Sequence, residues 1–195
     1  MQRTLIIFVK EPHPGRVKTR LGAGIGLVAA AWWFRRQSQR LIRRLGRDPR
    51  WRTTLAVSPD REGLSSRVWP KCATRQPQGS GDLGARMLRA LSSAPPGPVM
   101  IVGSDIPDIS PSDIADGFRK LGHHDAVFGP AEDGGYWLIG FRHAPPRDLF
   151  AGVRWSTEHA LADTLANLQD KRVAFLRVLN DVDEVSDLQR RGGQV

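Results

Sequence analysis

The stretch that most constrains the fold is residues 98–109, which read P-V-M-I-V-G-S-D-I-P-D-I. Residues 99–102 form a short, uninterrupted apolar run, which is typical of a strand buried on both faces of a parallel sheet. The run ends at Gly103, and Asp105 is the first charge after it. Because open α/β sheets bind ligands at the carboxyl ends of their strands, Asp105 is a candidate site residue. The alternative is that Asp105 only caps the next helix, although Ser110 and Ser112 are better placed for that role.

Composition limits the class of protein. With 195 residues, 40% of them hydrophobic and 25% charged, the chain is expected to form a single globular domain over residues 1–195. The most apolar stretch, residues 23–34, is shorter than the roughly 18–20 residues that span a bilayer, so we expect no membrane span and a cytoplasmic protein. A single cysteine, Cys72, excludes an internal disulfide and, with five scattered histidines, argues against a zinc site.

The net charge of +9 is compatible with a nucleic-acid partner. Part of the excess lies in residues 25–46, whose apolar residues recur at the spacing of an amphipathic helix. A second stripe of this helix carries four arginines: Arg36, Arg40, Arg43 and Arg47. A solvated outer face explains them better than a nucleic-acid surface, because Trp32 and Trp33 are the only aromatic residues near them in this helix outside its apolar stripe.

A cationic loop follows the first predicted strand. Residues 4–9 are apolar and β-branched, and residues 10–21 then read K-E-P-H-P-G-R-V-K-T-R-L. A strand that runs into a stiff, glycine-bearing, cationic loop before a helix is a place to hold phosphates. The glycine spacing of a Walker loop or a dinucleotide fingerprint is absent, and a solvated basic turn is an equal alternative.

Two glycine turns complete the set of candidate site segments. Residues 78–84 read Q-G-S-G-D-L-G before a predicted helix, where the glycines allow a close approach to a ligand or simply form a turn. Residues 130–136 read P-A-E-D-G-G-Y between two predicted strands, which puts Asp133 at a sheet edge or in a plain hairpin turn.

The remaining segments predict further strands and helices. Strands are expected at residues 51–57, 126–129, 137–141 and 173–179, and helices at 83–93, 111–121, 156–168 and after 184. Residues 58–75 give no clear pattern.

Taken in order, five motifs resemble one family: F-V-K through P-G to V-K-T-R-L at residues 8–21, Q-G-x-G-D-L-G-x-R-M at 78–87, G-S-D-x-P at 103–107, P-A-x-D-G-G-Y at 130–136 and W-S-T at 155–157. This is the glycosyltransferase-A-like family of uncharacterised bacterial proteins (DUF2064), one branch of which is assigned to arsenosugar biosynthesis. The chain more distantly resembles the phospholactate and molybdenum-cofactor guanylyltransferases. The resemblance implies the nucleotide-diphospho-sugar transferase (GT-A) fold, an α/β fold with a mainly parallel sheet and helices on both faces.

The resemblance also implies roles for single residues. Asp105 would be a metal-binding acid, and Asp183 a second one, because V-D-x-x-x-D-L at residues 182–188 resembles the ending of sugar-activating cytidylyltransferases. Lys18 and Asp133 would be catalytic. Nucleotide-binding roles fall on Lys10, Gly15, Lys18, Arg20, Gly81 and Asp82, and sugar or acceptor contacts on Gly134, Gly135, Tyr136 and Trp155.

These residues predict a transferase that depends on Mg²⁺ or Mn²⁺ and acts on a nucleotide or nucleotide-sugar and a small-molecule acceptor. Such transfer loads negative charge onto a diphosphate, and hard carboxylates with a Lys/Arg loop supply what neutralises it. Glycosyl and nucleotidyl transfer fit the residues equally well. The alternatives are a non-catalytic basic nucleic-acid-binding protein and a nucleotide-binding regulator with a decayed site.

Overall fold

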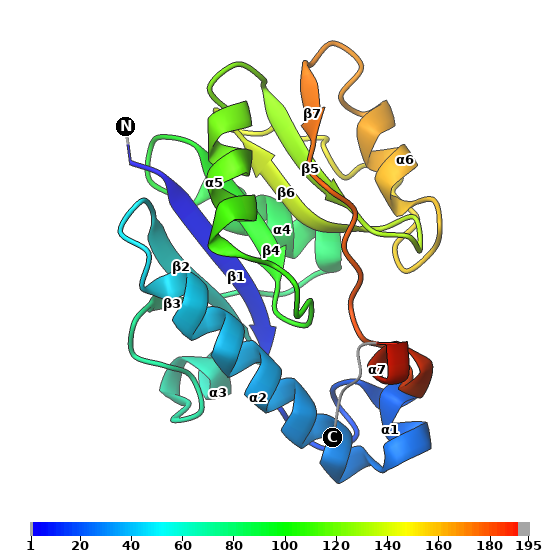
Figure 1. Ribbon diagram of the computed structural model, residues 1–195. Helices are drawn as coiled ribbons and strands as arrows, with labels where there is room; N and C mark the ends of the chain where they lie inside the picture. Colours follow the sequence, from blue (N-terminus) through cyan, green and yellow to red (C-terminus); the bar gives the residue numbers. More distant parts are fainter. Residues whose placement is uncertain (1, 191–195) are drawn as a thin grey trace.

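The computed structural model describes residues 2–190 and contains one seven-stranded sheet, ordered β3-β2-β1-β4-β6-β5-β7 (Figure 1). Strand β6 is antiparallel to both of its neighbours, and every other pair is parallel. The predicted mainly parallel α/β fold is therefore confirmed. The strands are β1 (Thr4–Lys10), β2 (Arg52–Ser58), β3 (Thr74–Pro77), β4 (Val99–Gly103), β5 (Ala126–Pro130), β6 (Tyr136–Phe141) and β7 (Val173–Phe175).

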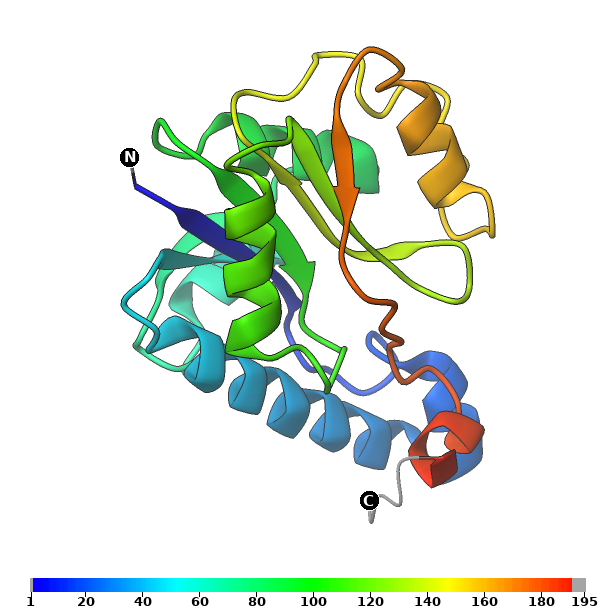
Figure 2. The same ribbon diagram turned by 45° about the horizontal axis from the view of Figure 1, so that its top comes forward.

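Helices cover both faces of the sheet (Figures 1 and 2). Helices α2 and α5 pack on one face and α4 and α6 on the other, while α1 and α7 lie together near the N-terminal end of α2. The helices are α1 (Thr19–Ile25), α2 (Leu27–Gly46), α3 (Asp60–Ser65), α4 (Leu83–Ser92), α5 (Pro111–Lys120), α6 (Ala160–Ala166) and α7 (Val185–Arg190). None of the helices in the described part of the chain is long and apolar enough to cross a membrane.

The central strand β1 divides the core in two, because successive side chains of a strand point to opposite faces. Leu5 and Ile7 join the apolar cluster under α2 and α5, whereas Ile6 joins the cluster under α4 and α6. All three are at most 1% exposed. The apolar runs of β1 and β4 thus mark strands buried on both faces, as predicted.

The cap of α5 also follows the prediction. Ser110 and Asp113 form a reciprocal capping box in which each side chain accepts a hydrogen bond from the other's backbone N–H. Asp105 is therefore not the cap of this helix. Its carboxylate is left for the site at the end of β4.

Three element predictions need correction, and one segment without a prediction forms regular structure. The helix expected over residues 25–46 begins at Leu27, because Gly26 adopts a φ of 89° and separates α1 from α2. The helix expected from residue 156 begins at Ala160, because Ser156 has a left-handed backbone. Strand β7 ends at Phe175 instead of residue 179. Within residues 58–75, which gave no pattern, the chain forms α3 and the start of the half-exposed edge strand β3.

The sheet brings the candidate site segments to one edge. The cationic loop follows β1, Asp105 follows β4, the 78–84 turn follows β3, and the chain after β7 runs down to α7 at the same edge (Figure 1). Residues 131–135 join β5 to the antiparallel β6, so this segment is the hairpin turn that the sequence left open. Five separate parts of the chain therefore supply one site.

Candidate functional site

The centre of the site is the ammonium group of Lys18. Its Nζ atom lies 2.8 Å from Asp105 Oδ2, 2.9 Å from Asp181 Oδ2 and 2.5 Å from Asp183 Oδ1. The lysine side chain is only 5% exposed, and the three carboxylate side chains are 29–38% exposed. One buried cation is thus surrounded by three partly hydrated anions.

The backbone of Lys18 directs its side chain inward. Lys18 immediately precedes α1 and has φ 46° and ψ 49°, in the left-handed region that non-glycine residues rarely adopt. The buried Val17 anchors the loop just before it. The Pro/Gly loop therefore buries this lysine instead of leaving it in solvent.

Asp181 and Asp183 owe their positions to the residue between them. Val182 is fully buried in a small cluster with Leu21 and Leu188, which fixes the segment against α1 and α7. The two aspartates on either side of Val182 both reach Lys18. Asp187 also stabilises this segment, because its Oδ2 accepts hydrogen bonds from the backbone N–H groups of Asp183 and Glu184, at 2.9 and 2.8 Å.

The charges in the cluster perturb one another. Burial alone would lower the pKa of Lys18, but the three carboxylates outweigh it and raise the pKa above its ordinary value. Burial raises the pKa of Asp181 to about 6, against the opposing effect of Lys18. Burial acts in the same sense on Asp183, but the Lys18 charge and hydrogen bond, together with Arg20, keep the pKa of Asp183 below its ordinary value. Arg20 Nη2 lies 2.9 Å from Asp183 Oδ2.

A cavity of about 660 Å³ opens on the cationic side of this cluster. Its basic residues come from the end of β1, the loop after it, the start of α1, and α4: Lys10, Arg16, Lys18, Arg20 and Arg86. Gly81 and Asp82 lie on its wall. The Asp82 carboxylate accepts a 2.8 Å hydrogen bond from the Ala85 N–H and caps α4, so it is engaged with the helix. Gly15, with φ 78°, forms the turn behind this wall and does not line the cavity.

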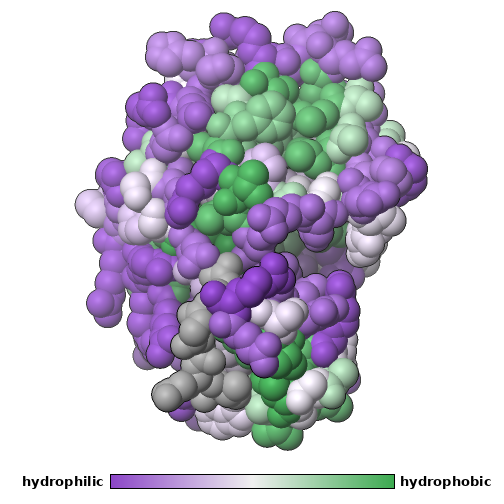
Figure 3. Space-filling model, turned by 45° about the vertical axis from the view of Figure 1, so that its right-hand side comes forward, coloured by the Kyte–Doolittle hydropathy of each residue, from purple (hydrophilic) through white to green (hydrophobic). Residues whose placement is uncertain are grey.

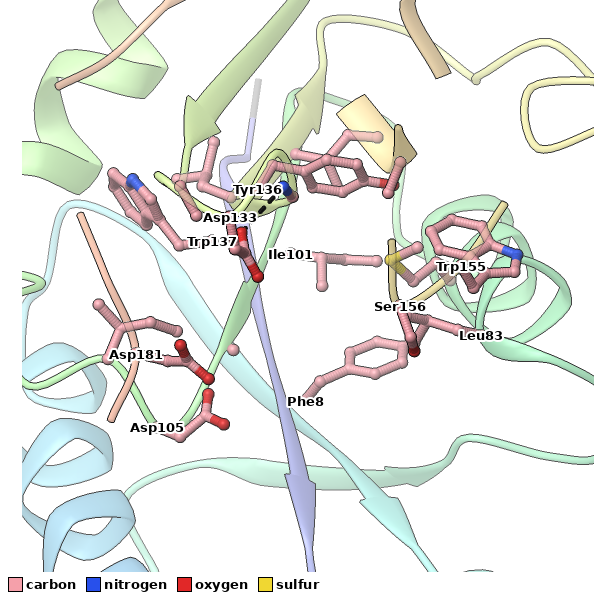
Figure 4. A pocket seen from close by; sticks show the side chains of 18 of the residues that line it. Phe8, Leu83, Ile101, Asp105, Asp133, Tyr136, Trp137, Trp155, Ser156 and Asp181 are labelled. Atoms are coloured by element: carbon pink, nitrogen blue, oxygen red, sulfur yellow. Dashed lines mark hydrogen bonds between the residues drawn. The ribbon is translucent and has the colours of Figure 1, made fainter. Parts of the chain in front are cut away.

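A second, smaller cavity of about 280 Å³ adjoins the first and shares Phe8, Leu83 and Asp105 with it (Figure 4). Asp133, Tyr136 and Trp155 line it. Figure 4 shows Asp105 and Asp181 on one side of this cavity and Trp155 and Leu83 on the other.

The hairpin turn that bears Asp133 is held against the start of α6. The Asp133 carboxylate accepts a 2.9 Å hydrogen bond from the Gly135 N–H (Figure 4). Gly134 has φ 79°, and a Cβ there would lie 2.1 Å from the Glu158 carbonyl oxygen, so only glycine fits. Gly135 also lines the cavity.

The aromatic residues of this cavity are fixed from behind. Trp155 packs on Phe150, with ring centroids 5.4 Å apart, and lies so close to Gly84 that a Cβ there would be 2.8 Å from the indole. Tyr136 stacks edge-on against Phe128 at 5.4 Å, and burial raises the pKa of its hydroxyl.

Among the non-glycine residues that the structure describes, only Lys18 and Ser156 have a positive φ, and both line these cavities. Strained backbone persists only where the surrounding structure holds it, and it concentrates at functional sites.

A band of hydrophilic side chains crosses the face of the molecule seen in Figure 3, between apolar surface above and below it. On their outer side, Asp181 and Asp183 border a third, polar cavity. The carboxylate cluster is therefore reachable from three directions.

Comparison with known proteins agrees with this fold. The family described as an uncharacterized protein conserved in bacteria (DUF2064) matches residues 41–157. A candidate nucleotide-diphospho-sugar transferase from Desulfovibrio desulfuricans G20 is 34% identical, with a TM-score of 0.88 over 96% of this chain and 85% of that one. The chain belongs to the DUF2064 family.

More distant members of the fold are also similar. The 4-diphosphocytidyl-2C-methyl-D-erythritol synthase from Anaerococcus prevotii DSM 20548 matches with 10% identity and a TM-score of 0.62, over 97% of this chain and 93% of that one. A CMP:2-keto-3-deoxy-manno-octonic acid synthetase complexed with CTP matches with 11% identity and a TM-score of 0.58, over 98% and 97%. These likenesses show the GT-A-like fold. No curated protein matches the sequence.

In this DUF2064 protein the structure adds one carboxylate and two arginines to the predicted set. Asp105 and Asp183 meet at Lys18, but Asp181 meets them there too, and sequence reasoning did not single it out. The signal was available, because Asp181-Val182-Asp183 places two carboxylates around one apolar residue in an extended segment. Arg16 and Arg86 also join the cationic wall without having been predicted.

Across the described residues, no group of three or more His, Cys, Asp or Glu side chains stands ready to enclose a metal ion. The three aspartates are oriented toward the Lys18 ammonium instead. Their roles as metal ligands, and the predicted roles of the other site residues, therefore stay predictions.

Proposed function

We propose that this protein is a divalent-metal-dependent transferase that acts on a nucleotide or a nucleotide-sugar. The observation that carries the proposal is the convergence of three carboxylates on buried Lys18, between a cationic cavity and an apolar one. The relative from Desulfovibrio desulfuricans, at 34% identity, supports the substrate class.

The cationic cavity suits a nucleotide diphosphate or triphosphate. Its volume of about 660 Å³ lies within the range of small-molecule sites, and five basic side chains face it. Lys10 makes no ion pair with any described residue, so its charge is available to a ligand. Transfer at a phosphate or at an anomeric carbon leaves negative charge on phosphate oxygens, and fixed cations stabilise that charge.

The carboxylate cluster fits Mg²⁺ or Mn²⁺ in the chemistry of its donors. Asp105, Asp181 and Asp183 supply hard oxygen ligands of the kind these ions prefer. Three carboxylates against one ammonium leave two negative charges within the cluster, of which Arg20 offsets one from the outside. A bound divalent cation would supply further neutralisation of the phosphate charge. We propose that Lys18 balances the charge of the three carboxylates while no metal is bound. When metal is bound, Lys18, which lines the cationic cavity, pairs with the phosphates of the nucleotide.

We propose that the hairpin turn between β5 and β6 contributes the Asp133 carboxylate to the binding of the acceptor. Asp133 is exposed, lines the smaller cavity, and is paired only with the Gly135 N–H among the described residues. A carboxylate in that position can orient an acceptor hydroxyl or amine and accept its proton. In this proposal Asp133 binds the acceptor and Lys18 binds the nucleotide.

The experiment is thermal unfolding with UDP, GDP, CTP, GTP and UDP-glucose, each with and without 5 mM MgCl₂. Stabilisation by at least one nucleotide that requires Mg²⁺ is expected, because a ligand at 100 times its Kd adds about 2.7 kcal/mol. Release of pyrophosphate from a triphosphate would then identify nucleotidyl transfer, and release of a nucleoside diphosphate from a nucleotide-sugar would identify glycosyl transfer. Metal-dependent binding without turnover would favour a regulator, and affinity for duplex DNA that falls steeply with salt but ignores Mg²⁺ would overturn the proposal.

A further inference from the structure

The smaller cavity differs in chemistry from the cationic cavity beside it. Its walls are aromatic and aliphatic. Phe8, Ile101 and Tyr136 come from three strands, Leu83 from α4 and Trp155 from the loop before α6 (Figure 4). Met87 of α4 also lines the cavity. Such a wall removes apolar ligand surface from water, at roughly 25 cal/mol for each Å². The ligand that fits it therefore carries an apolar group, and the aromatic rings of Tyr136 and Trp155 favour a planar one, because aromatic rings pair with one another.

The charges of this cavity are of one sign. Asp105, Asp133 and Asp181 line it, and none of the described residues that line it is Lys, Arg or His. The nearest cation, Lys18, faces the other cavity and is already paired with two of these acids. A phosphate or carboxylate placed here would be desolvated beside Asp133, whose negative charge remains unpaired when a cation binds Asp105 and Asp181, and this is unfavourable.

Asp133 gives the cavity its one unpaired negative charge. Its carboxylate makes a hydrogen bond to the Gly135 N–H and has no cationic partner among the described residues. Asp105 and Asp181, by contrast, share the Lys18 ammonium. A hydroxyl or ammonium group would therefore be attracted to Asp133 while the apolar part of the same molecule packs on Trp155.

We infer that the acceptor of this transferase is an alcohol or amine with a planar apolar group and no phosphate or carboxylate. The inference rests on the proposed function, because it assigns the smaller cavity to the acceptor. The two cavities meet at Phe8, Leu83 and Asp105, so a molecule in the smaller cavity presents its polar group beside the site of the phosphates.

A matched set of three probes tests this directly: 2-naphthylmethylamine, 2-naphthylmethanol and 2-naphthoate, which differ in charge and share one apolar ring system. Ligand-observed NMR titrations at pH 7 should give the tightest binding for the amine, weaker binding for the alcohol, and at least tenfold weaker binding for the carboxylate. Asp133→Asn removes the charge but keeps the oxygen that accepts from Gly135. It should reduce the preference for the amine over the alcohol by about two- to fivefold, as expected for a partly exposed charge pair.

Leu83→Arg is the complementary variant, because Leu83 is 46% exposed and its replacement leaves the core intact. This variant should improve binding of 2-naphthoate relative to the amine. Equal or tighter binding of the carboxylate by the unaltered protein, no binding of any probe, or an unchanged amine preference in Asp133→Asn would overturn the inference. Nucleotide stabilisation with Mg²⁺ is measured on the same Asp133→Asn sample, so a failure of the acceptor assignment is distinguished from a failure of the nucleotide site.

Discussion

Replacing Lys18 with methionine removes the one cation that three carboxylates share. Methionine keeps the length and apolar stem of lysine, so the variant fills the same space and changes mainly the charge. The charge of the cluster then falls from −2 to −3, counting Lys18 and its three partners. The folded protein must hold these anions together with no ammonium between them.

The expected loss in the free energy of unfolding follows from the burial of Lys18 and of its three carboxylate partners. Removing one partner of a buried ion pair costs about 3–5 kcal/mol. The carboxylate side chains are 29–38% exposed and so remain partly hydrated, which reduces the expected loss to about 2–3 kcal/mol at pH 8. Without the ammonium, repulsion among the three carboxylates favours their protonated forms in the folded state. The folded variant then binds more protons than the unfolded chain, and its deficit shrinks as the pH falls toward 4.5.

Urea unfolding at pH 8 and pH 4.5, with and without 10 mM MgCl₂, measures these effects. At pH 8, Mg²⁺ should stabilise Lys18→Met more than the unaltered protein, because no ammonium competes for the carboxylates; a tenfold excess over Kd adds about 1.4 kcal/mol. Lys10→Met is the matched control, since Lys10 lines the same cavity without an ion pair among the described residues, and it should unfold like the unaltered protein. If Lys18→Met is as stable as this control at pH 8 and indifferent to Mg²⁺, the reasoning is refuted.

Two other variants test the account. Asp181→Asn should make the metal-free protein more stable at pH 8 and no different at pH 3.5. Because the pKa of Asp181 is raised to about 6 in the folded state, ionising it destabilises the unaltered protein as the pH rises from about 4 to 6. The loss is about 1 kcal/mol, since the side chain is 38% exposed and partly hydrated. A variant whose stability depends on pH in the same way as that of the unaltered protein would contradict this. The second variant carries glutamine at four exposed arginines, three on α2 and one directly after it, and nucleotide binding measured by titration calorimetry should change less than twofold; a larger loss would show that this face binds a substrate or partner. The four are Arg36, Arg40, Arg43 and Arg47.

The fold could be predicted from the sequence where burial leaves a pattern. The apolar runs that become β1 and β4 are buried on both faces, and Ser110 marks the start of α5, so local chemistry and final structure agree. The edge strand β3 has no such pattern, because its residues are exposed or half-exposed. The break at Gly26 was not predicted, since a lone glycine inside a helical pattern is commonly tolerated.

The site was predictable as a set of segments but not as a set of contacts. The glycine and aspartate motifs were recognisable by resemblance, and the sheet brings them to one edge. That Lys18 is buried among aspartates could not be read from its loop, where two prolines and a glycine suggest solvent exposure. Its position depends on contacts with Asp181 and Asp183, more than 160 residues away in the chain, and no local pattern reports such contacts.

The central claim is that the three carboxylates bind a divalent cation needed for nucleotide binding, and titration calorimetry on Asp105→Asn tests it most directly. The unaltered protein should bind its preferred nucleotide, identified in the thermal panel, only when Mg²⁺ or Mn²⁺ is present. Asp105→Asn keeps the size of the side chain and leaves Lys18 with two carboxylates, so it should fold with equal or greater stability without metal. The account predicts that this variant loses metal-dependent nucleotide binding by at least tenfold. Unchanged binding, with unchanged dependence on the metal, would contradict it.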